Sequence, residues 1–159
     1  NTGNEKYIAD AIYCNDRSLS SGTGIGTTET YYAAETRRNN EQPTLKCAND
    51  NDKFTKSTTI GNGKLTKMIG LITSDEVMYA GGTVSSSNNE YYLYSGKYYW
   101  TMTPYSYAFG LTFVGFVYID GGLSDNNVTN PNAVRPVVSL KSDAISGGSG
   151  TAANPFFVG

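Results

Sequence analysis

The chain of 159 residues contains no histidine. This absence excludes catalytic triads and dyads in which histidine is the general base, and it excludes every zinc site with an imidazole ligand. Only two cysteines are present, so a metal site with four thiolate ligands is excluded as well. Because the commonest catalytic arrangements are missing, the sequence predicts a protein that is not an enzyme.

Charged residues are scarce, at 16% of the chain, and the 12 Lys and Arg residues are scattered. Without a basic cluster the chain cannot neutralise a phosphate backbone or bind an anionic membrane surface. Nucleic acid is therefore not an expected partner. Tyrosine (13) and glycine (18) are abundant instead, together with many asparagines. This polar but weakly charged composition is typical of secreted and cell-surface β-rich proteins, so we expect an extracellular or cell-surface location.

Cys14 and Cys47 can form at most one disulfide within the chain. The extracellular composition favours that disulfide over two unrelated buried thiols. The length fits one domain, residues 1–159. Because the chain starts at Asn1 without methionine, we expect a mature or trimmed domain that has lost an N-terminal segment. That segment would have targeted the protein or attached it to a membrane or a filament.

The N-terminal half is largely irregular. Residues 6–14 fit a short helix or a strand, and residues 31–39 (YYAAETRRN) have the composition of a short helix. Residues 64–71 predict a short strand. After it, Thr73 and Glu76 have the spacing of a capping box, which predicts a helix that ends at Gly81-Gly82.

Residues 98–119 carry no charged side chain and hold most of the aromatic residues of the C-terminal half. Polar residues and Pro104 interrupt them, which argues against a membrane helix and favours two strands that turn near Gly110 or Gly115. In one register the large side chains share one face of these strands, either as core or as an exposed contact surface. These residues are Tyr105, Tyr107, Phe109, Leu111 and Phe113.

Three segments resemble the formylglycine-generating-enzyme-like domains. Residues 71–82 (LITSDEVMYAGG) are similar to the helix motif of that family, which reads approximately L-P-T-x-x-E-W-E-Y-A-x-x-G-G. Residues 99–101 (YWT) resemble its W-T strand, and residues 134–138 (VRPVV) resemble its closing strand. The segments fall in the family's order over about the C-terminal half. Both cysteines precede residue 71, whereas the enzyme's catalytic pair lies late in its domain, so the oxidase activity is not carried over.

This resemblance implies an α+β, C-type-lectin-like fold, with short helices around a small, mostly antiparallel sheet and long irregular loops. The variable proteins of diversity-generating retroelements share that fold, and the layout also resembles gut-bacterial surface and pilin-like proteins. In such a protein the ligand-binding face would lie within residues 105–132, and it would recognise a protein or a glycan as a receptor or an adhesin does. We expect aromatic anchoring by the five residues named above and hydrogen bonding by Asn126, Asn127, Asn130 and Asn132.

Within that fold, Trp100 and Val137 are expected in the core, and Arg135 is expected to hold the closing strand against a carboxylate. A structural subunit of a pilus or surface filament, which would associate with further copies of itself, is the alternative function. A carboxylate-based hydrolase is a third possibility.

Cofactors are not expected. Two loop clusters supply the oxygen ligands that calcium prefers, but neither has EF-hand spacing, and solvated turns explain them better. Asp75 and Glu76 fit the first turn of a helix, which explains them without catalysis. The two clusters are Asn49, Asp50, Asn51 and Asp52, and Asp120, Asp125 and Asn126.

Overall fold

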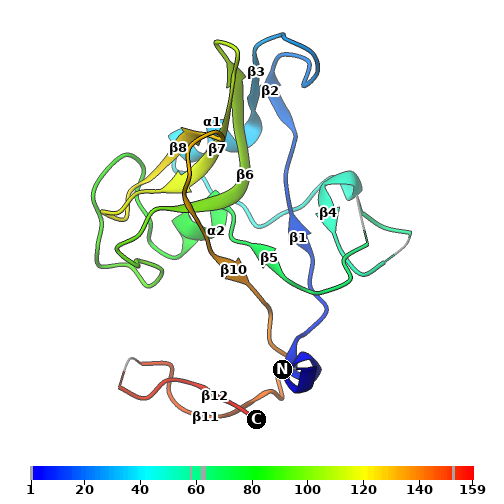
Figure 1. Ribbon diagram of the computed structural model, residues 1–159, viewed down its shortest axis with the longest axis vertical. Coiled ribbons are helices and arrows are strands. Elements are labelled where there is room, and N and C mark those ends of the chain that lie inside the picture. Colours follow the sequence, from blue (N-terminus) through cyan, green and yellow to red (C-terminus); the bar gives the residue numbers. More distant parts are fainter. Residues whose placement is uncertain (1, 58, 62–63, 152) are drawn as a thin grey trace.

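The computed structural model describes residues 2–57, 59–61, 64–151 and 153–159. These residues form an α+β fold with two short α-helices and mostly antiparallel strands, which confirms the coarse fold class (Figure 1). The elements are η1 (Thr2–Tyr7), β1 (Tyr13–Cys14), β2 (Leu19–Ser21), β3 (Thr30–Tyr32), α1 (Ala33–Asn39), η2 (Asp50–Asp52), β4 (Lys53–Phe54), β5 (Gly70–Leu71), α2 (Ser74–Tyr79), β6 (Tyr99–Ala108), β7 (Leu111–Val117), β8 (Leu123–Asn127), β9 (Ala133–Val134), β10 (Pro136–Val137), β11 (Ile145–Gly147) and β12 (Phe157–Val158).

The central sheet has the strand order β2-β3-β6-β7-β8, and β9 pairs in parallel with the start of β6. Its longest strands, β6 and β7, form an antiparallel hairpin that turns at Phe109-Gly110, the first of the two predicted positions. Gly115 lies inside β7 instead. Tyr, Trp, Thr, Val and Phe make up most of these two strands, as expected for a half-buried β surface.

Helix α2 begins where the sequence predicts. The Thr73 side chain accepts a hydrogen bond from the backbone N–H of Glu76 at 3.1 Å, and the Glu76 carboxylate accepts one from the backbone N–H of Thr73 at 2.8 Å. This capping box satisfies two N–H groups that the helix itself cannot pair. After the helix, Gly81 has a φ of +100°, so the predicted glycine at the C-terminal end is confirmed.

Two other elements differ from their predicted bounds. The helix predicted over residues 31–39 begins at Ala33, because Tyr31 and Tyr32 belong to β3. Tyr31 pairs with Ser106 of β6, and this tertiary contact decides the conformation of the segment. The strand predicted over residues 64–71 is reduced to β5, which pairs with β10.

The core lies between α2 and the sheet. Val77 of α2 and Leu123 of β8 have no exposed surface, and they pack with Tyr99 and Val117 from the start of β6 and the end of β7. Ile72 and Tyr91 complete this buried cluster. Val137 is half-buried and packs against the cluster, whereas Trp100, also predicted as core, is half-buried on the sheet.

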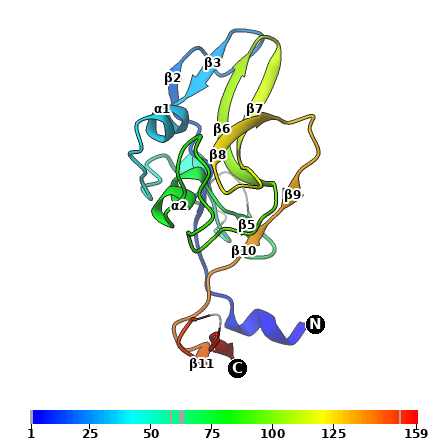
Figure 2. The ribbon, with the colours of Figure 1, turned by 90° about the vertical axis from the view of Figure 1, so that its left-hand side faces the viewer.

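Both α-helices lie on the same side of the β6–β7 hairpin (Figure 2). Gly115 explains how closely α2 approaches this face. A Cβ at that position would lie 2.4 Å from the Ser74 Oγ atom and 2.8 Å from the Thr101 Oγ1 atom. The absence of a side chain in the middle of β7 therefore lets the first residue of α2 contact the sheet directly.

The two ends of the chain lie together, far from the tip of the β6–β7 hairpin (Figure 1). An antiparallel bridge between Ile8 and Leu140 joins the segments that lead to them. Beyond this bridge, β11 and β12 form a separate two-stranded hairpin. No α-helix of the described residues is long and apolar enough to span a bilayer.

The predicted disulfide is confirmed. Cys14 and Cys47 are bonded, with their Cα atoms 5.8 Å apart, at a sequence separation of 33. The bond ties β1 to the irregular segment that follows α1. A disulfide in a small domain is compatible with an extracellular location.

Candidate recognition surfaces

The five large residues predicted on one face do not share a face. Because the hairpin turn has only two residues, Leu111 lies opposite Ala108 and Thr112 lies opposite Tyr107. Residues that are directly opposite in an antiparallel pair project to the same side, so Leu111 projects to the side opposite Tyr107. Phe113 lies opposite Ser106 and is on the Leu111 side as well. The predicted continuous face, Tyr105, Tyr107, Phe109, Leu111 and Phe113, is therefore wrong.

Tyr105 is half-buried and contacts a side chain of α1. The Arg38 guanidinium lies 4.2 Å from the centre of the Tyr105 ring and donates a 2.7 Å hydrogen bond to its hydroxyl. Arg38 also donates to Asp125 of β8 at 3.1 Å. Burial is the main reason that the pKa of Tyr105 rises to about 12. The ring therefore joins α1 to the sheet.

Three of the predicted asparagines gather in one turn at the end of β8. The Asn126 side-chain oxygen accepts hydrogen bonds from the Asn127 N–H and from the Asn130 side chain, at 2.9 and 2.6 Å. The Asn127 oxygen accepts from the N–H and the hydroxyl of Thr129. These oxygens shape the turn. Asn132 lies farther along the chain, next to β9, and is half-buried.

This turn lies beside the hairpin strand β7. Asn127 pairs with Phe113, and the Val128 N–H donates to the Thr112 carbonyl at 3.1 Å. The structure therefore brings the predicted asparagines of this turn close to Phe113, although it does not place all the predicted binding residues on one face.

Large apolar side chains are also exposed at the end of the central sheet that lies opposite the chain termini. There the tip of the β6–β7 hairpin lies beside the loop between β2 and β3 (Figures 1 and 2). Phe109 is 83% exposed and Ile25 is 76% exposed, and Leu111 is 44% exposed. The Phe109 N–H donates to the Glu29 carboxylate at 3.2 Å, which links the two loops. We call Ile25 and Phe109 the apical surface; Leu111 projects to the side of the hairpin opposite Tyr107, whereas Ile25 lies on the Tyr107 side.

Phe109 combines this exposure with an unfavourable backbone conformation. Its φ is +55° and that of Gly110 is +75°, as a type I′ turn requires. Asn, Asp and Gly are the residues that normally occupy both positions of such a turn, and a left-handed conformation costs other residues about 1 kcal/mol. Neither burial nor local geometry therefore accounts for a phenylalanine here.

Tyr107 lies beneath the β2–β3 loop. A hollow of about 200 Å³ separates Tyr107 and Thr112 from the loop residues Ile25 and Thr28. Tyr107 is half-buried there.

A second aromatic group lies at the other end of the same hairpin. Buried Phe116 contacts Tyr98, Trp100 and Tyr118, with ring centroids 6.3, 5.9 and 4.6 Å away. Tyr98 and Tyr118 are 42% and 41% exposed, and we call this pair the tyrosine surface. The expected binding residues did not include it, although both rings belong to the uncharged stretch that the sequence singles out.

Among the described residues Arg135 has no carboxylate partner, contrary to the expectation from sequence. Its guanidinium donates a hydrogen bond to the Leu93 carbonyl and lies 5.0 Å from the centre of the Tyr99 ring. The closing strand is therefore held by a backbone oxygen and an aromatic ring.

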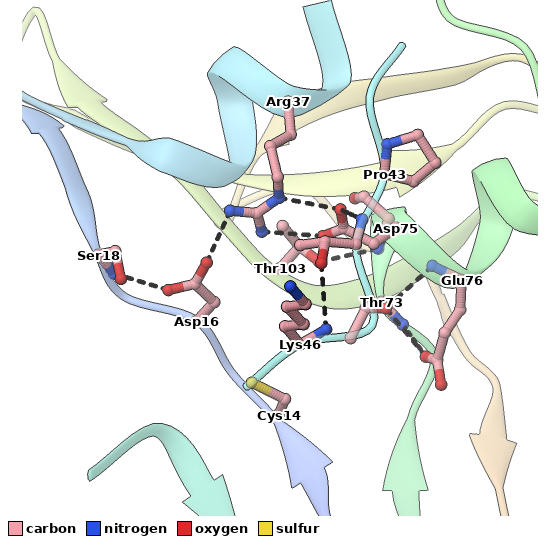
Figure 3. A network of polar contacts seen from close by, with 12 residues as sticks. Cys14, Asp16, Ser18, Arg37, Pro43, Lys46, Thr73, Asp75, Glu76 and Thr103 are labelled. Atoms are coloured by element: carbon pink, nitrogen blue, oxygen red, sulfur yellow. Dashed lines mark hydrogen bonds and ion pairs between the residues drawn. The ribbon is translucent and has the colours of Figure 1, made fainter. Parts of the chain in front are cut away.

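The helix side of the molecule contains a polar network centred on Arg37 of α1 (Figure 3). Arg37 donates to both carboxylate oxygens of Asp75 at 3.0 Å and to Asp16 at 2.7 Å. Asp75 is buried and also accepts from the Thr44 N–H at 2.9 Å. One guanidinium therefore connects α1, α2 and the segments around the disulfide.

The pKa shifts agree with this network. The hydrogen bonds to Asp75 are the main reason that the pKa of Arg37 is raised. Burial raises the pKa of Asp16, but hydrogen bonds from Ser18 and Arg37 outweigh it, so the pKa of Asp16 lies below its usual value. Both shifts favour the charged forms.

A cavity of about 220 Å³ lies beside the network. Its lining includes Arg37, Lys46, Asp75 and Glu76. Both carboxylates already have partners, since Asp75 accepts from Arg37 and Glu76 caps α2. The arrangement therefore connects elements of the fold.

The carboxylates considered for calcium likewise have separate partners. Asp52 pairs with Arg17 and Asp50 with Lys53. Asp125 pairs with Arg38, whereas Asp120 accepts from Ser87 and from the Gly122 N–H. Within the described residues, no three acidic or cysteine side chains converge on a position for a metal ion.

Comparisons with family models, with curated proteins and with solved structures find no match for this chain.

Proposed function

We propose that this protein is an extracellular, non-enzymatic recognition domain that binds a protein or a glycan, as a receptor or an adhesin does. The observation that carries the proposal is the apical surface, where Phe109 and Ile25 are largely exposed on two loops that a hydrogen bond joins. Aromatic side chains provide much of the binding free energy in recognition surfaces at a low entropic cost.

The rest of the molecule suits this role because it forms a fixed frame. The disulfide, the Arg37 network and the stacking of Arg38 on Tyr105 all lie below the apical surface. A frame that is already ordered loses little conformational entropy when a ligand binds.

A C-type-lectin-like fold is part of the proposal. Its support is the capped helix α2 followed by the β6–β7–β8 sheet in the expected order, together with the pairing of Ile8 and Leu140 near the chain ends. Membership among the variable proteins of diversity-generating retroelements is proposed on the resemblance alone. Sequences of sibling genes test it: substitutions should concentrate in residues 105–132, and a uniform spread would contradict it.

Paired variants test the binding role. Phe109→Asn changes the apical surface, and Tyr98→Ser with Tyr118→Ser changes the tyrosine surface. The wild-type domain and both variants would be measured against a glycan array and a displayed library of small folded proteins. We expect one of the two surfaces to account for binding. Ligands that bind all three proteins equally would contradict the proposal.

The alternative, a filament subunit, has one observation in its favour. The β11–β12 hairpin lies apart from the central sheet (Figure 2). Four apolar residues in and next to its strands are exposed. A two-stranded hairpin is marginally stable by itself, so a neighbouring subunit would stabilise it. Sedimentation at high protein concentration separates the two functions, because a stable monomer counts against a filament. The exposed residues are Ile145, Phe156, Phe157 and Val158.

A further inference from the structure

We infer that the apical surface is an anchor for a protein partner, and that Phe109 enters an apolar pocket on that partner. This inference rests on the proposed recognition function and specifies the class of ligand. It starts from Phe109, whose 83% exposure and φ of +55° are both unfavourable in the isolated domain. A bound partner that buries the ring offsets these costs, whereas no contact within the described part of the chain does so.

The surroundings of Phe109 match the centre of a protein interface. The loop residues 18–28 and the hairpin residues 105–113 carry no charged side chain. Nearby Glu29 accepts the Phe109 N–H, which fixes the turn. Apart from Glu29, the side chains of these two segments are uncharged, and charged residues are depleted at the centre of a binding hot spot.

A lipid bilayer fits the same residues less well. The side chains of Ile25 and Phe109 together contain fewer carbon atoms than one myristoyl chain, which alone gives binding constants of only about 10⁴ M⁻¹. Stable attachment then requires a second signal such as a basic cluster. No Lys or Arg occurs within residues 18–30, 105–113 or 126–132.

A glycan also fits the apical surface less well than it fits the tyrosine surface. Sugars stack on flat aromatic rings and form hydrogen bonds with polar neighbours, whereas Ile25 beside Phe109 is aliphatic. Tyr98 and Tyr118 instead expose parts of two aromatic rings that Phe116 supports. The proposed function allows a protein or a glycan as ligand. A protein therefore fits the apical surface better, and a glycan fits the tyrosine surface better.

A selection experiment tests the inference. A naive displayed library of small folded binding domains is selected on the wild-type protein, and each clone is then measured against Phe109→Asn. Asparagine tolerates the left-handed turn, so this variant keeps the hairpin. We expect most clones to lose at least about tenfold in affinity. The matched control, Tyr98→Ser with Tyr118→Ser, should leave the same clones unchanged.

The melting temperature of Phe109→Asn provides a second readout that does not depend on any partner. Because the variant relieves the backbone and removes an exposed ring, we expect a rise of about 2–4 °C. A lower melting temperature would show that Phe109 supports the fold, and the inference would be overturned.

Other results overturn the inference in distinguishable ways. Wild-type protein that sediments with phosphatidylcholine vesicles, when Phe109→Asn does not, would identify a bilayer as the ligand. Self-association that Phe109→Asn abolishes would identify a second copy of the chain. Glycans or clones that need Tyr98 and Tyr118 would leave the recognition function standing but reject the apical anchor. Clones that depend on neither surface would contradict both proposals.

Discussion

The helix side of the central sheet and the apical end of its hairpin differ in the type of side chain they carry and in what those side chains contact. On the helix side, Arg37 and Arg38 pair with Asp16, Asp75 and Asp125. At the apical end, Phe109 and Ile25 face solvent. This weakly charged chain therefore uses several of its charges to connect elements of the fold, while it leaves large apolar side chains exposed at one end.

The difference indicates a division of roles. Buried ion pairs with several hydrogen bonds fix one arrangement of the helices and the disulfide segment, and removing one partner leaves an uncompensated charge. Exposed apolar side chains contribute little to stability and become useful when another molecule covers them. Substitutions on the helix side should therefore mainly change stability, whereas apical substitutions should mainly change binding.

The largest effect on the helix side is expected from the disulfide. Replacing Cys14 and Cys47 by serine removes a link at a sequence separation of 33, which the chain-entropy model values at about 3–4 kcal/mol. Urea unfolding measures the loss in free energy of unfolding. Phe109→Asn is the comparison, since it should not destabilise the protein. A loss below about 1 kcal/mol would show that this segment is held mainly by the Arg37 network.

Asp75→Asn should destabilise the domain by about 2–3 kcal/mol, because it removes the charge that faces Arg37 in a buried position. Thermal and urea unfolding measure the effect. Asp50→Asn is the matched control: its ion pair with Lys53 is exposed, so the change should stay within about 0.5 kcal/mol. Equal effects at both positions would mean that the network does not hold the helices.

Gly115→Ala should cost about 1–3 kcal/mol, because the new Cβ would lie only 2.4 Å from the Ser74 Oγ atom. In Gly147→Ala, the Cβ would lie 3.6 Å from the nearest Phe157 atom, which is an ordinary contact. That variant should be close to neutral in chemical unfolding. If Gly115→Ala were equally neutral, α2 would not pack as closely on the sheet as the structure indicates.

Acid should lower the free energy of unfolding through the carboxylates of the helix side. Since the pKa of Asp16 is lowered in the folded protein, its stabilising contribution is present above the unfolded pKa of about 3.9 and is lost as the pH falls through the folded value. Urea midpoints at pH 5, 4 and 3 should therefore fall more in the wild type than in Asp16→Asn. Parallel curves would exclude a contribution from this carboxylate.

Local sequence patterns predict several parts of this fold. The capping box of Thr73 and Glu76 predicts the start of α2 because both partners lie within one helical turn. The pairing of Cys14 with Cys47 follows because no other cysteine is present. The segment at Tyr31 and Tyr32 could not be predicted as a strand, because its conformation depends on β6, far along the chain.

The candidate site shows the same limit. Counting every second residue from Tyr105 to Phe113 assumes a continuous strand, but a two-residue turn changes which residues share a face. Phe109 in a left-handed conformation gives no turn signal in the sequence, unlike Asn-Gly. Tyr98 and Tyr118 come together only through the pairing of β6 with β7, so their surface could not be found from spacing along the chain.

The most direct test of the central claim measures stability and binding on the same Phe109→Asn protein. If a fixed frame presents Phe109 to a protein partner, the melting temperature should rise by about 2–4 °C, while the affinity of clones selected on the wild type falls at least about tenfold. A lower melting temperature, or unchanged affinity across those clones, would contradict the account.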